Sequence, residues 1–237
     1  MSSYYYSNDG RGRGGFLSSL PPVTKNLLII NVIFYIATLL NKNFMIQTFA
    51  LFYPSSPVFR WWQVLPHMFL HGNFMHIFFN MYTLLMFGCV IERTLGAKKF
   101  VLYYFVCGFG AAALHTGVEY LQMQSFMDSA ALGHSGALSQ ISALRYTPTV
   151  GASGAIYGLL ISYAFLFPKS QMTLLFPPVT MSAKWMITIF IVLEFLAGMS
   201  GKASDVAHFA HLGGALIGLL VMWIWKRRHI LFDKDKI

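Results

Sequence analysis

The chain has 237 residues, of which 56% are hydrophobic and 11% charged, and its mean hydropathy is +0.58. This composition excludes an ordinary soluble domain, because too few polar residues would remain to face water. The formal net charge of +9 does not indicate a nucleic-acid partner, because the basic residues flank apolar segments, where anionic lipid and membrane topology explain them better. We therefore predict an integral multi-pass membrane protein whose partners include lipids but no nucleic acid.

The chain divides into a tail, a membrane domain and a second tail. Residues 1–24 are rich in Ser, Gly and Tyr, which is typical of a flexible segment. The apolar segments occupy residues 25–226, and a basic tail covers residues 227–237. Nothing of domain size remains outside the apolar region, so one membrane domain is expected.

Six apolar segments approach the roughly 20 residues that a helix needs to cross a bilayer. They cover residues 26–40, 71–91, 100–120, 150–167, 184–199 and 205–225. The first loop between them, residues 41–70, is rich in aromatic residues and proline and is expected to lie in the membrane interface. The prediction is an all-α bundle of six transmembrane helices.

The distribution of Lys and Arg predicts the orientation of this bundle. With a cytoplasmic N-terminus, 13 of the 17 basic residues fall on the cytoplasmic side. The other four are Lys42, Arg60, Arg145 and Lys202. Because basic residues accumulate in cytoplasmic loops, both termini are predicted to be cytoplasmic.

Polar side chains interrupt the second, fourth and sixth segments. Such residues are costly at membrane depth and usually functional. They are His71, His76 and Asn80 in the second segment, Ser153 in the fourth, and His208 and His211 in the sixth. All three segments run in the same direction, and His76, Ser153 and His211 lie about three to six residues from their outer ends. At about 1.5 Å per residue, these side chains share one level in the outer part of the membrane.

Small residues at four-residue spacing accompany two of these polar positions. Gly154 and Gly158 form one stripe in the fourth segment, and Ala210, Gly214 and Gly218 form another in the sixth. Stripes of this kind allow helix backbones to approach closely. Close backbones would bring the short Ser153 side chain within hydrogen-bonding reach of an imidazole on the sixth segment.

These residue types predict nucleophilic catalysis. A serine hydroxyl needs a base, and His211 can take its proton and later return it to a leaving amine. The developing oxyanion needs donors, which His76, Asn80 and the backbone N–H at the start of the Ser153 helix can supply. Asp205 lies about 600° around the helix from His211, so it faces elsewhere. No carboxylate is expected beside the base, and a Ser–His dyad is predicted.

The motifs in this chain resemble those of the rhomboid intramembrane serine proteases. They are His76-x-x-x-Asn80, Gly151-Ala152-Ser153-Gly154, Ala210-His211-x-x-Gly214-x-x-x-Gly218 and Glu92-Arg93-x-x-Gly96. The first three occur in the family's order on the second, fourth and sixth segments, and the fourth resembles its structural loop motif. The resemblance covers residues 23–226. One departure is Trp62-Gln63, where many members carry Trp-Arg.

The resemblance implies roles for individual residues. Ser153 would attack a peptide bond in the transmembrane segment of a single-pass membrane protein, with His211 as base. His76, Asn80 and the Ser153 backbone N–H would form the oxyanion hole, and Tyr157 would pack against the histidine ring. The fifth segment would be the gate for substrate. No cofactor or metal is expected, and the compact core suggests a bacterial plasma membrane.

Other interpretations of the polar residues remain open. His208 is expected to be a packing neighbour of the base, and His67 and His71 to bond loop backbone. Glu194 in the fifth segment is either a buried polar tie, which we favour, or an element of the gate. A zinc protease would require a His-Glu-x-x-His helix or an added carboxylate, and the sequence has neither pattern.

Two alternative functions are compatible with the composition. The chain could be a catalytically inactive rhomboid-like protein that binds membrane helices, although such a protein would be expected to lack the serine or the histidine. It could also be a proton-coupled transporter using histidines as a relay, although no internal repeat is evident.

Overall fold

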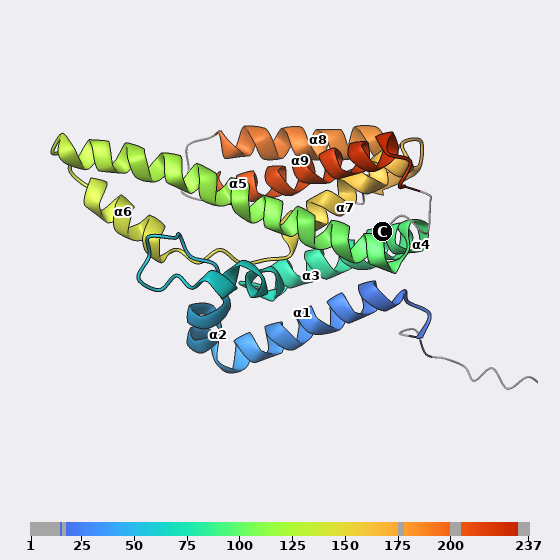
Figure 1. Ribbon diagram of the computed structural model, residues 1–237, viewed down its shortest axis with the longest axis horizontal. Helices are drawn as coiled ribbons and strands as arrows, with labels where there is room; N and C mark the ends of the chain where they lie inside the picture. The colour runs from blue at the N-terminus through green and yellow to red at the C-terminus, as the bar shows by residue number, and fades with distance from the viewer. Residues whose placement is uncertain (1–14, 16–17, 175–177, 200–204, 232–237) are drawn as a thin grey trace, which may run out of the picture.

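The computed structural model describes residues 15, 18–174, 178–199 and 205–231, and it is mostly helical (Figure 1). Most of the predicted N-terminal tail, residues 1–24, lies outside the described residues, as do residues 232–237 of the predicted C-terminal tail. The side chains of residues 205–207, which include Asp205, are also outside them.

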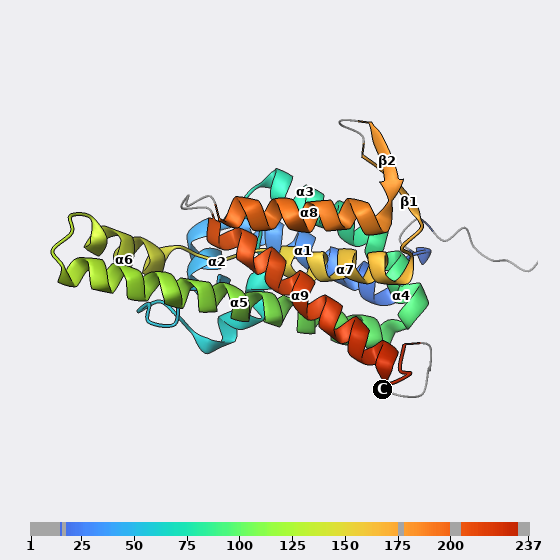
Figure 2. The same ribbon diagram turned by 90° about the horizontal axis from the view of Figure 1, so that it is seen from above.

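The elements follow one another in this order: α1 (Pro22–Leu40), α2 (Lys42–Phe49), η2 (Trp61–Val64), η3 (Pro66–Phe69), α3 (Phe74–Thr83), the π-helical turn η4 (Leu84–Gly88), α4 (Cys89–Leu95), α5 (Ala97–Ala131), α6 (Ala137–Tyr146), α7 (Ser153–Leu166), β1 (Gln171–Leu174), β2 (Val179–Ser182), α8 (Ala183–Gly198) and α9 (Asp205–Arg227). The strands form an antiparallel pair in which Gln171 lies opposite Ser182. This pair was not predicted, and it connects α7 to α8 at one end of the bundle (Figure 2).

Four helical segments in the described residues are long and apolar enough to cross a membrane. They are Pro22–Leu40, Phe74–Leu95, Ala97–Ala131 and His208–Arg227. The helices α7 and α8 are also apolar, but their 14 and 16 residues are shorter than the other four. The prediction of a helical membrane protein is therefore confirmed, while six crossings and cytoplasmic termini remain predictions.

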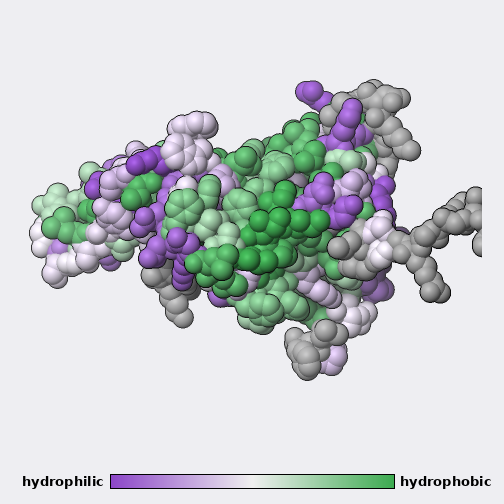
Figure 3. Space-filling model, turned by 90° about the horizontal axis from the view of Figure 1, so that it is seen from below, coloured by the Kyte–Doolittle hydropathy of each residue, from purple (hydrophilic) through white to green (hydrophobic). Residues whose placement is uncertain are grey.

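The outer surface of the bundle is apolar where lipid would contact it. Large hydrophobic side chains are exposed on α1, α3, α8 and α9, including Ile33, Phe79, Leu193 and Leu216. One face of the molecule shows a hydrophobic band in its middle and polar residues toward both ends (Figure 3). Water would penalise such a band, whereas the hydrocarbon of a bilayer matches it.

The helices α5, α7 and α9 pack against one another at small residues. A Cβ added at Gly214 on α9 would overlap the backbone of Gly154 on α7, and one added at Gly218 would lie 3.0 Å from the Gly158 Cα. On the α5 side, the Tyr103 hydroxyl donates to the Gly158 carbonyl at 2.7 Å. The two stripes of small residues therefore do bring α7 and α9 into backbone contact, as the sequence predicts.

A buried carboxylate attaches α1 to α4. Glu92 accepts hydrogen bonds from the backbone N–H groups of Val23 and Thr24, at 2.9 and 2.7 Å, and from the Thr24 hydroxyl at 2.8 Å. A negative charge at a helix N-terminus is favourable because the first N–H groups have no partner within the helix. The next residue, Arg93, donates to the Ser19 carbonyl at 3.1 Å. Glu92 and Arg93 therefore tie α4 to the start of α1 and to the segment that precedes it.

The loop between α2 and α3 is anchored by Gln63. Its side chain is fully buried. It accepts from the Arg60 backbone N–H at 3.0 Å and donates to the carbonyls of Gln47 and Val58 at 3.3 and 3.2 Å. An uncharged amide can therefore fix this loop, because it supplies both a donor and an acceptor.

Candidate active site

The chain entering α7 is held by the loop before α3. Leu51 and Thr149 exchange backbone hydrogen bonds at 3.0 and 2.8 Å, and the Gly151 N–H donates to the His67 carbonyl at 2.9 Å. Gly151 has a φ of +130°, and a Cβ there would lie 2.8 Å from the His76 Nε2. Only glycine suits both the conformation and the close approach. These contacts place Ser153 as the first residue of α7, beside His76.

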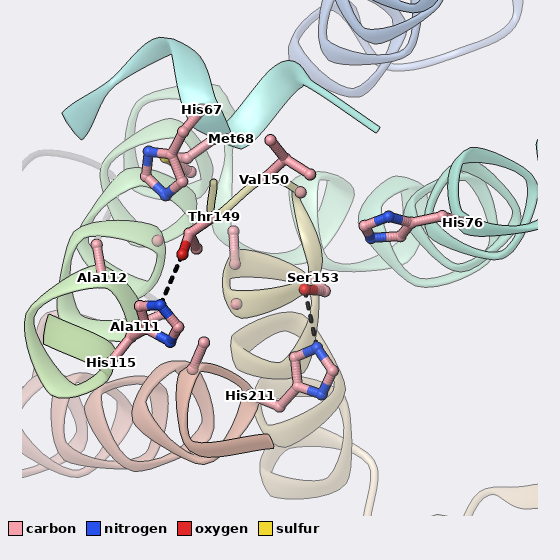
Figure 4. Close-up of a pocket in the computed structure, with 15 residues that line it drawn as sticks. His67, Met68, His76, Ala111, Ala112, His115, Thr149, Val150, Ser153 and His211 are labelled. Atoms are coloured by element: carbon pink, nitrogen blue, oxygen red, sulfur yellow. Dashed lines mark hydrogen bonds between the residues drawn. The ribbon is translucent and has the colours of Figure 1, made fainter. Parts of the chain in front are cut away.

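Ser153 and His211 form a hydrogen bond across the α7–α9 contact. The Ser153 Oγ lies 2.9 Å from the His211 Nε2 (Figure 4). The Gly154–Gly214 backbone contact lies next to this pair and fixes the distance between the two helices. The geometry is that of a nucleophile with its base, provided that the proton of the imidazole is on Nδ1.

The imidazole of His211 is oriented by an aromatic ring. The rings of Tyr157 and His211 lie parallel, with an interplanar angle of 5° and 4.5 Å between centroids. Tyr157 is one turn after Ser153 on α7, so the same helix carries the nucleophile and the surface on which the base rests. This contact leaves the imidazole little freedom to rotate away from Ser153.

Candidate oxyanion donors lie on the other side of Ser153. His76 points toward Ser153 from α3 (Figure 4), and its Nδ1 accepts from the Gly72 N–H at 3.5 Å, which leaves Nε2 as a donor. Asn80, one turn later, is buried, and its Nδ2 has no hydrogen-bond partner in the described part of the chain. Ser153 itself begins a helix, so its backbone N–H lacks a partner within that helix. His71 packs edge-on against the His76 ring at 4.9 Å.

A cavity of about 210 Å³ opens beside the Ser153–His211 pair. Polar side chains line its far wall, where the His115 Nε2 and the Thr149 Oγ1 are 2.7 Å apart (Figure 4). Burial lowers the pKa of His67 to about 4, so its neutral ring donates from Nδ1 to the Gln63 carbonyl at 3.1 Å. A cavity of this size and polarity can hold water next to the serine.

One carboxylate lies beside the base, contrary to the sequence-based prediction. The Glu194 Oε2, on α8, is 3.1 Å from the His211 Nδ1 and 2.5 Å from the His208 Nδ1, and its Oε1 accepts from the Tyr157 hydroxyl. The prediction considered only the carboxylate on the same helix as His211, and Glu194 comes from a different one. The available signal was a lone acidic residue within the apolar segment 184–199.

The same three side chains have the spacing of metal ligands. One ligand atom each from Glu194, His208 and His211 lies within 4.8 Å of the others, the one such group found among the residues that the structure describes. Hydrogen bonds between the carboxylate and the two imidazoles already account for this clustering. The expected absence of a metal stays a prediction.

The family model of the Rhomboid domain matches residues 58–228, which include Ser153, His211, His76, Asn80, Tyr157 and Glu194. Among similar proteins is the Rhomboid protease AarA of Providencia stuartii, 27% identical over 84% of this chain and 70% of its own length. Rhomboid protein 1, mitochondrial, of Saccharomyces cerevisiae is 30% identical over 65% of this chain. The Presenilin-associated rhomboid-like protein, mitochondrial, of Homo sapiens is 29% identical over 69% of it.

The matched region covers different shares of the lengths of these relatives. The matched region is 39% of both the yeast and the human protein, so the chain spans well under half of their length. The family model, in contrast, covers most of this chain and extends from the loop before α3 to the end of α9. The chain belongs to the rhomboid family.

Proposed function

We propose that this protein is an intramembrane serine endopeptidase that cleaves transmembrane segments of single-pass membrane proteins near the outer face of the bilayer. The observation that carries the proposal is the 2.9 Å hydrogen bond between the Ser153 Oγ and the His211 Nε2, set beside a cavity in a bundle with an apolar exterior. Membership of the rhomboid family and similarity to a rhomboid protease support it.

The reaction begins when the Ser153 Oγ attacks the carbonyl carbon of the scissile peptide bond. His211 takes the hydroxyl proton on Nε2, and the carbonyl oxygen becomes an oxyanion. The His76 Nε2–H, the Asn80 Nδ2 and the Ser153 backbone N–H are the donors proposed to stabilise that charge. Each removed donor of this kind typically costs about 10² to 10³ in kcat.

The tetrahedral intermediate then collapses to an acyl-enzyme. The C–N bond breaks, and His211 returns its proton to the leaving amine. A water molecule from the cavity next gives a proton to His211 and adds to the ester carbonyl, and the carboxylic acid product leaves as Ser153 regains its proton. Gly151, Gly154, Gly214 and Gly218 support this chemistry by allowing the close approaches around Ser153 and His211.

The proposed topology has six crossings: α1, the α3–α4 helix, α5, α7, α8 and α9, with both termini cytoplasmic. The shorter α7 and α8 would cross the bilayer among the longer helices, with α8 at the entrance for substrate. The relatives come from a bacterium and from mitochondria, so they do not favour one membrane over the other. The proposed location in a bacterial plasma membrane rests on the sequence alone.

The test is labelling of the detergent-solubilised protein with a fluorescent fluorophosphonate. Wild type and His208→Ala should be labelled, whereas Ser153→Ala and His211→Ala should not. No labelling of folded wild-type protein would favour a catalytically inactive protein that binds membrane helices. Labelling that persists in Ser153→Ala would mean that the nucleophile is another residue.

A further inference from the structure

The geometry points to Glu194 as a positioning residue that completes a Ser153–His211–Glu194 relay, an inference that rests on the proposed function. The Glu194 Oε2 lies 3.1 Å from the His211 Nδ1, and the opposite ring nitrogen lies 2.9 Å from the Ser153 Oγ. The hydroxyl, the imidazole and the carboxylate therefore form one continuous hydrogen-bonded chain.

The carboxylate determines which nitrogen of His211 can act as the base. A neutral imidazole has one N–H donor and one acceptor nitrogen. Since a carboxylate can only accept, the proton of His211 stays on Nδ1 and Nε2 remains free to take the proton of Ser153. When that proton arrives, the negative charge of Glu194 also stabilises the imidazolium.

The position of Glu194 is itself fixed by two other helices. Its Oε1 accepts from the Tyr157 hydroxyl on α7, and its Oε2 accepts from the His208 Nδ1 on α9 as well as from His211. The side chain of Glu194 is 17% exposed, so it lies mostly out of solvent. These three donors would hold the carboxylate close to its present place, which is what a positioning residue needs.

This arrangement makes the base depend on α8. Ser153 and Tyr157 are carried by α7 and His211 by α9, but the partner of the His211 Nδ1 comes from α8, which packs beside both (Figures 1 and 2). A displacement of α8 would withdraw the carboxylate without moving the nucleophile. The ability of His211 to act as the base therefore depends on the position of α8.

The alternative is that Glu194 only ties α8 to its neighbours, as the sequence-based interpretation favoured. A tie would be needed for stability, whereas a positioning residue is needed for turnover. His208→Ala is the comparison variant, because it removes one partner of the same carboxylate oxygen and leaves the hydrogen bond between Glu194 and His211 in place. A purely structural role predicts similar losses in Glu194→Gln and His208→Ala.

The test compares wild type, Glu194→Gln, Glu194→Asp and His208→Ala in detergent. The readouts are the fluorophosphonate labelling rate, kcat and KM on a single-span fluorogenic substrate, and the thermal unfolding midpoint. Glutamine fills the same volume but can donate to Nδ1 and so favour the wrong tautomer. We expect Glu194→Gln to lower kcat at least tenfold with KM within twofold; a triad carboxylate-to-amide change costs about 10⁴-fold in the best-known case. Glu194→Asp should retain more activity than Glu194→Gln, and His208→Ala should lose less kcat than Glu194→Gln because the hydrogen bond between Glu194 and His211 remains.

Two results would overturn the inference while leaving the proposed function intact. One is a wild-type kcat in Glu194→Gln, and the other is an equal loss of kcat in His208→Ala. If Glu194→Gln fails to fold, ¹⁵N NMR of wild-type protein labelled at histidine decides the question: the proton of His211 should be on Nδ1, and finding it on Nε2 would refute the relay. Failure of the proposed function is different, because wild type itself would then neither label nor cleave.

Discussion

Replacing Gly214 with alanine tests whether the α7–α9 backbone contact sets the distance between nucleophile and base. A Cβ at Gly214 would lie 2.6 Å from the Gly154 carbonyl carbon and closer still to its oxygen, whereas ordinary contacts begin at 3.4 Å. The two backbones must therefore separate by about 0.8 Å or more. That shift, transmitted to the site, lengthens the 2.9 Å bond between Ser153 and His211 to about 3.7 Å, which is too long for a hydrogen bond.

The expected cost has two parts. Overpacking of this kind destabilises a protein by about 1–3 kcal/mol, and misplacement of reacting groups by about 1 Å can lower a rate about 10²-fold. The assay is the fluorophosphonate labelling rate of Gly214→Ala, measured together with its thermal unfolding midpoint. Gly117→Ala is the control, because Gly117 is also within a helix but an added Cβ there meets nothing within 4 Å. Labelling of Gly214→Ala at the wild-type rate would refute the reasoning.

Four further predictions follow from other contacts. Gln63→Ala leaves the Arg60 N–H and the Gln47 and Val58 carbonyls without their partner, so the unfolding free energy should fall by about 1–3 kcal/mol; an unchanged thermal midpoint would contradict the anchoring role. Glu92→Ala removes three hydrogen bonds at the start of α1 and should lower the midpoint more than Arg93→Ala, which removes one, and the reverse order would count against the tie between α4 and α1. Tyr157→Phe keeps the ring that packs against His211 but loses the hydrogen bond to Glu194. It should therefore retain more activity than Tyr157→Ala in the cleavage assay, and equal activities would show that the stacked ring does not orient His211. Cys89 and Cys107 are buried, so a membrane-impermeant maleimide should react only with introduced cysteines. In intact cells it should label Ser139→Cys but not His229→Cys, and labelling of His229→Cys would contradict the proposed topology.

The parts of the fold that follow a simple periodic or compositional signal were predictable. Apolar length located the helices, and the four-residue spacing of Gly154, Gly158, Gly214 and Gly218 anticipated where two of them touch. The hairpin of β1 and β2 was missed, because its two four-residue strands lie in a segment between two apolar helices where hydropathy gives no alternation to detect. Residues 121–149, which separate the third and fourth predicted segments, are mostly helical, since α5 continues through Ala131 and α6 follows.

The site was predictable where a pattern in the sequence marks its residues, and less so where only the folded structure brings them together. The Ser153–His211 pair could be anticipated from depth and small-residue stripes. The contact of Glu194 could not, because helical periodicity relates residues only within one helix and says nothing about which face of α8 meets α9. Gln63 illustrates the same limit: its three backbone partners precede it by 3, 5 and 16 residues, and only the folded loop brings them together around its side chain.

The length of α5 allows the depth of the nucleophile in the bilayer to be estimated. Its 35 residues extend about 52 Å, whereas the hydrocarbon core of a bilayer is about 30 Å thick. If the hydrocarbon core begins near Ala97, it ends about 20 residues later, near Gly117. The remainder of α5 then lies beyond the lipid, and with α6 it extends past the other helices (Figure 1). Ala111 contacts Gly154, next to the nucleophile, and lies about six residues, or 9 Å, short of that boundary. In the proposed reaction, a substrate cut at this depth would leave a segment of roughly two helical turns between the cleavage site and the aqueous phase, short enough for one product to leave without crossing the bilayer.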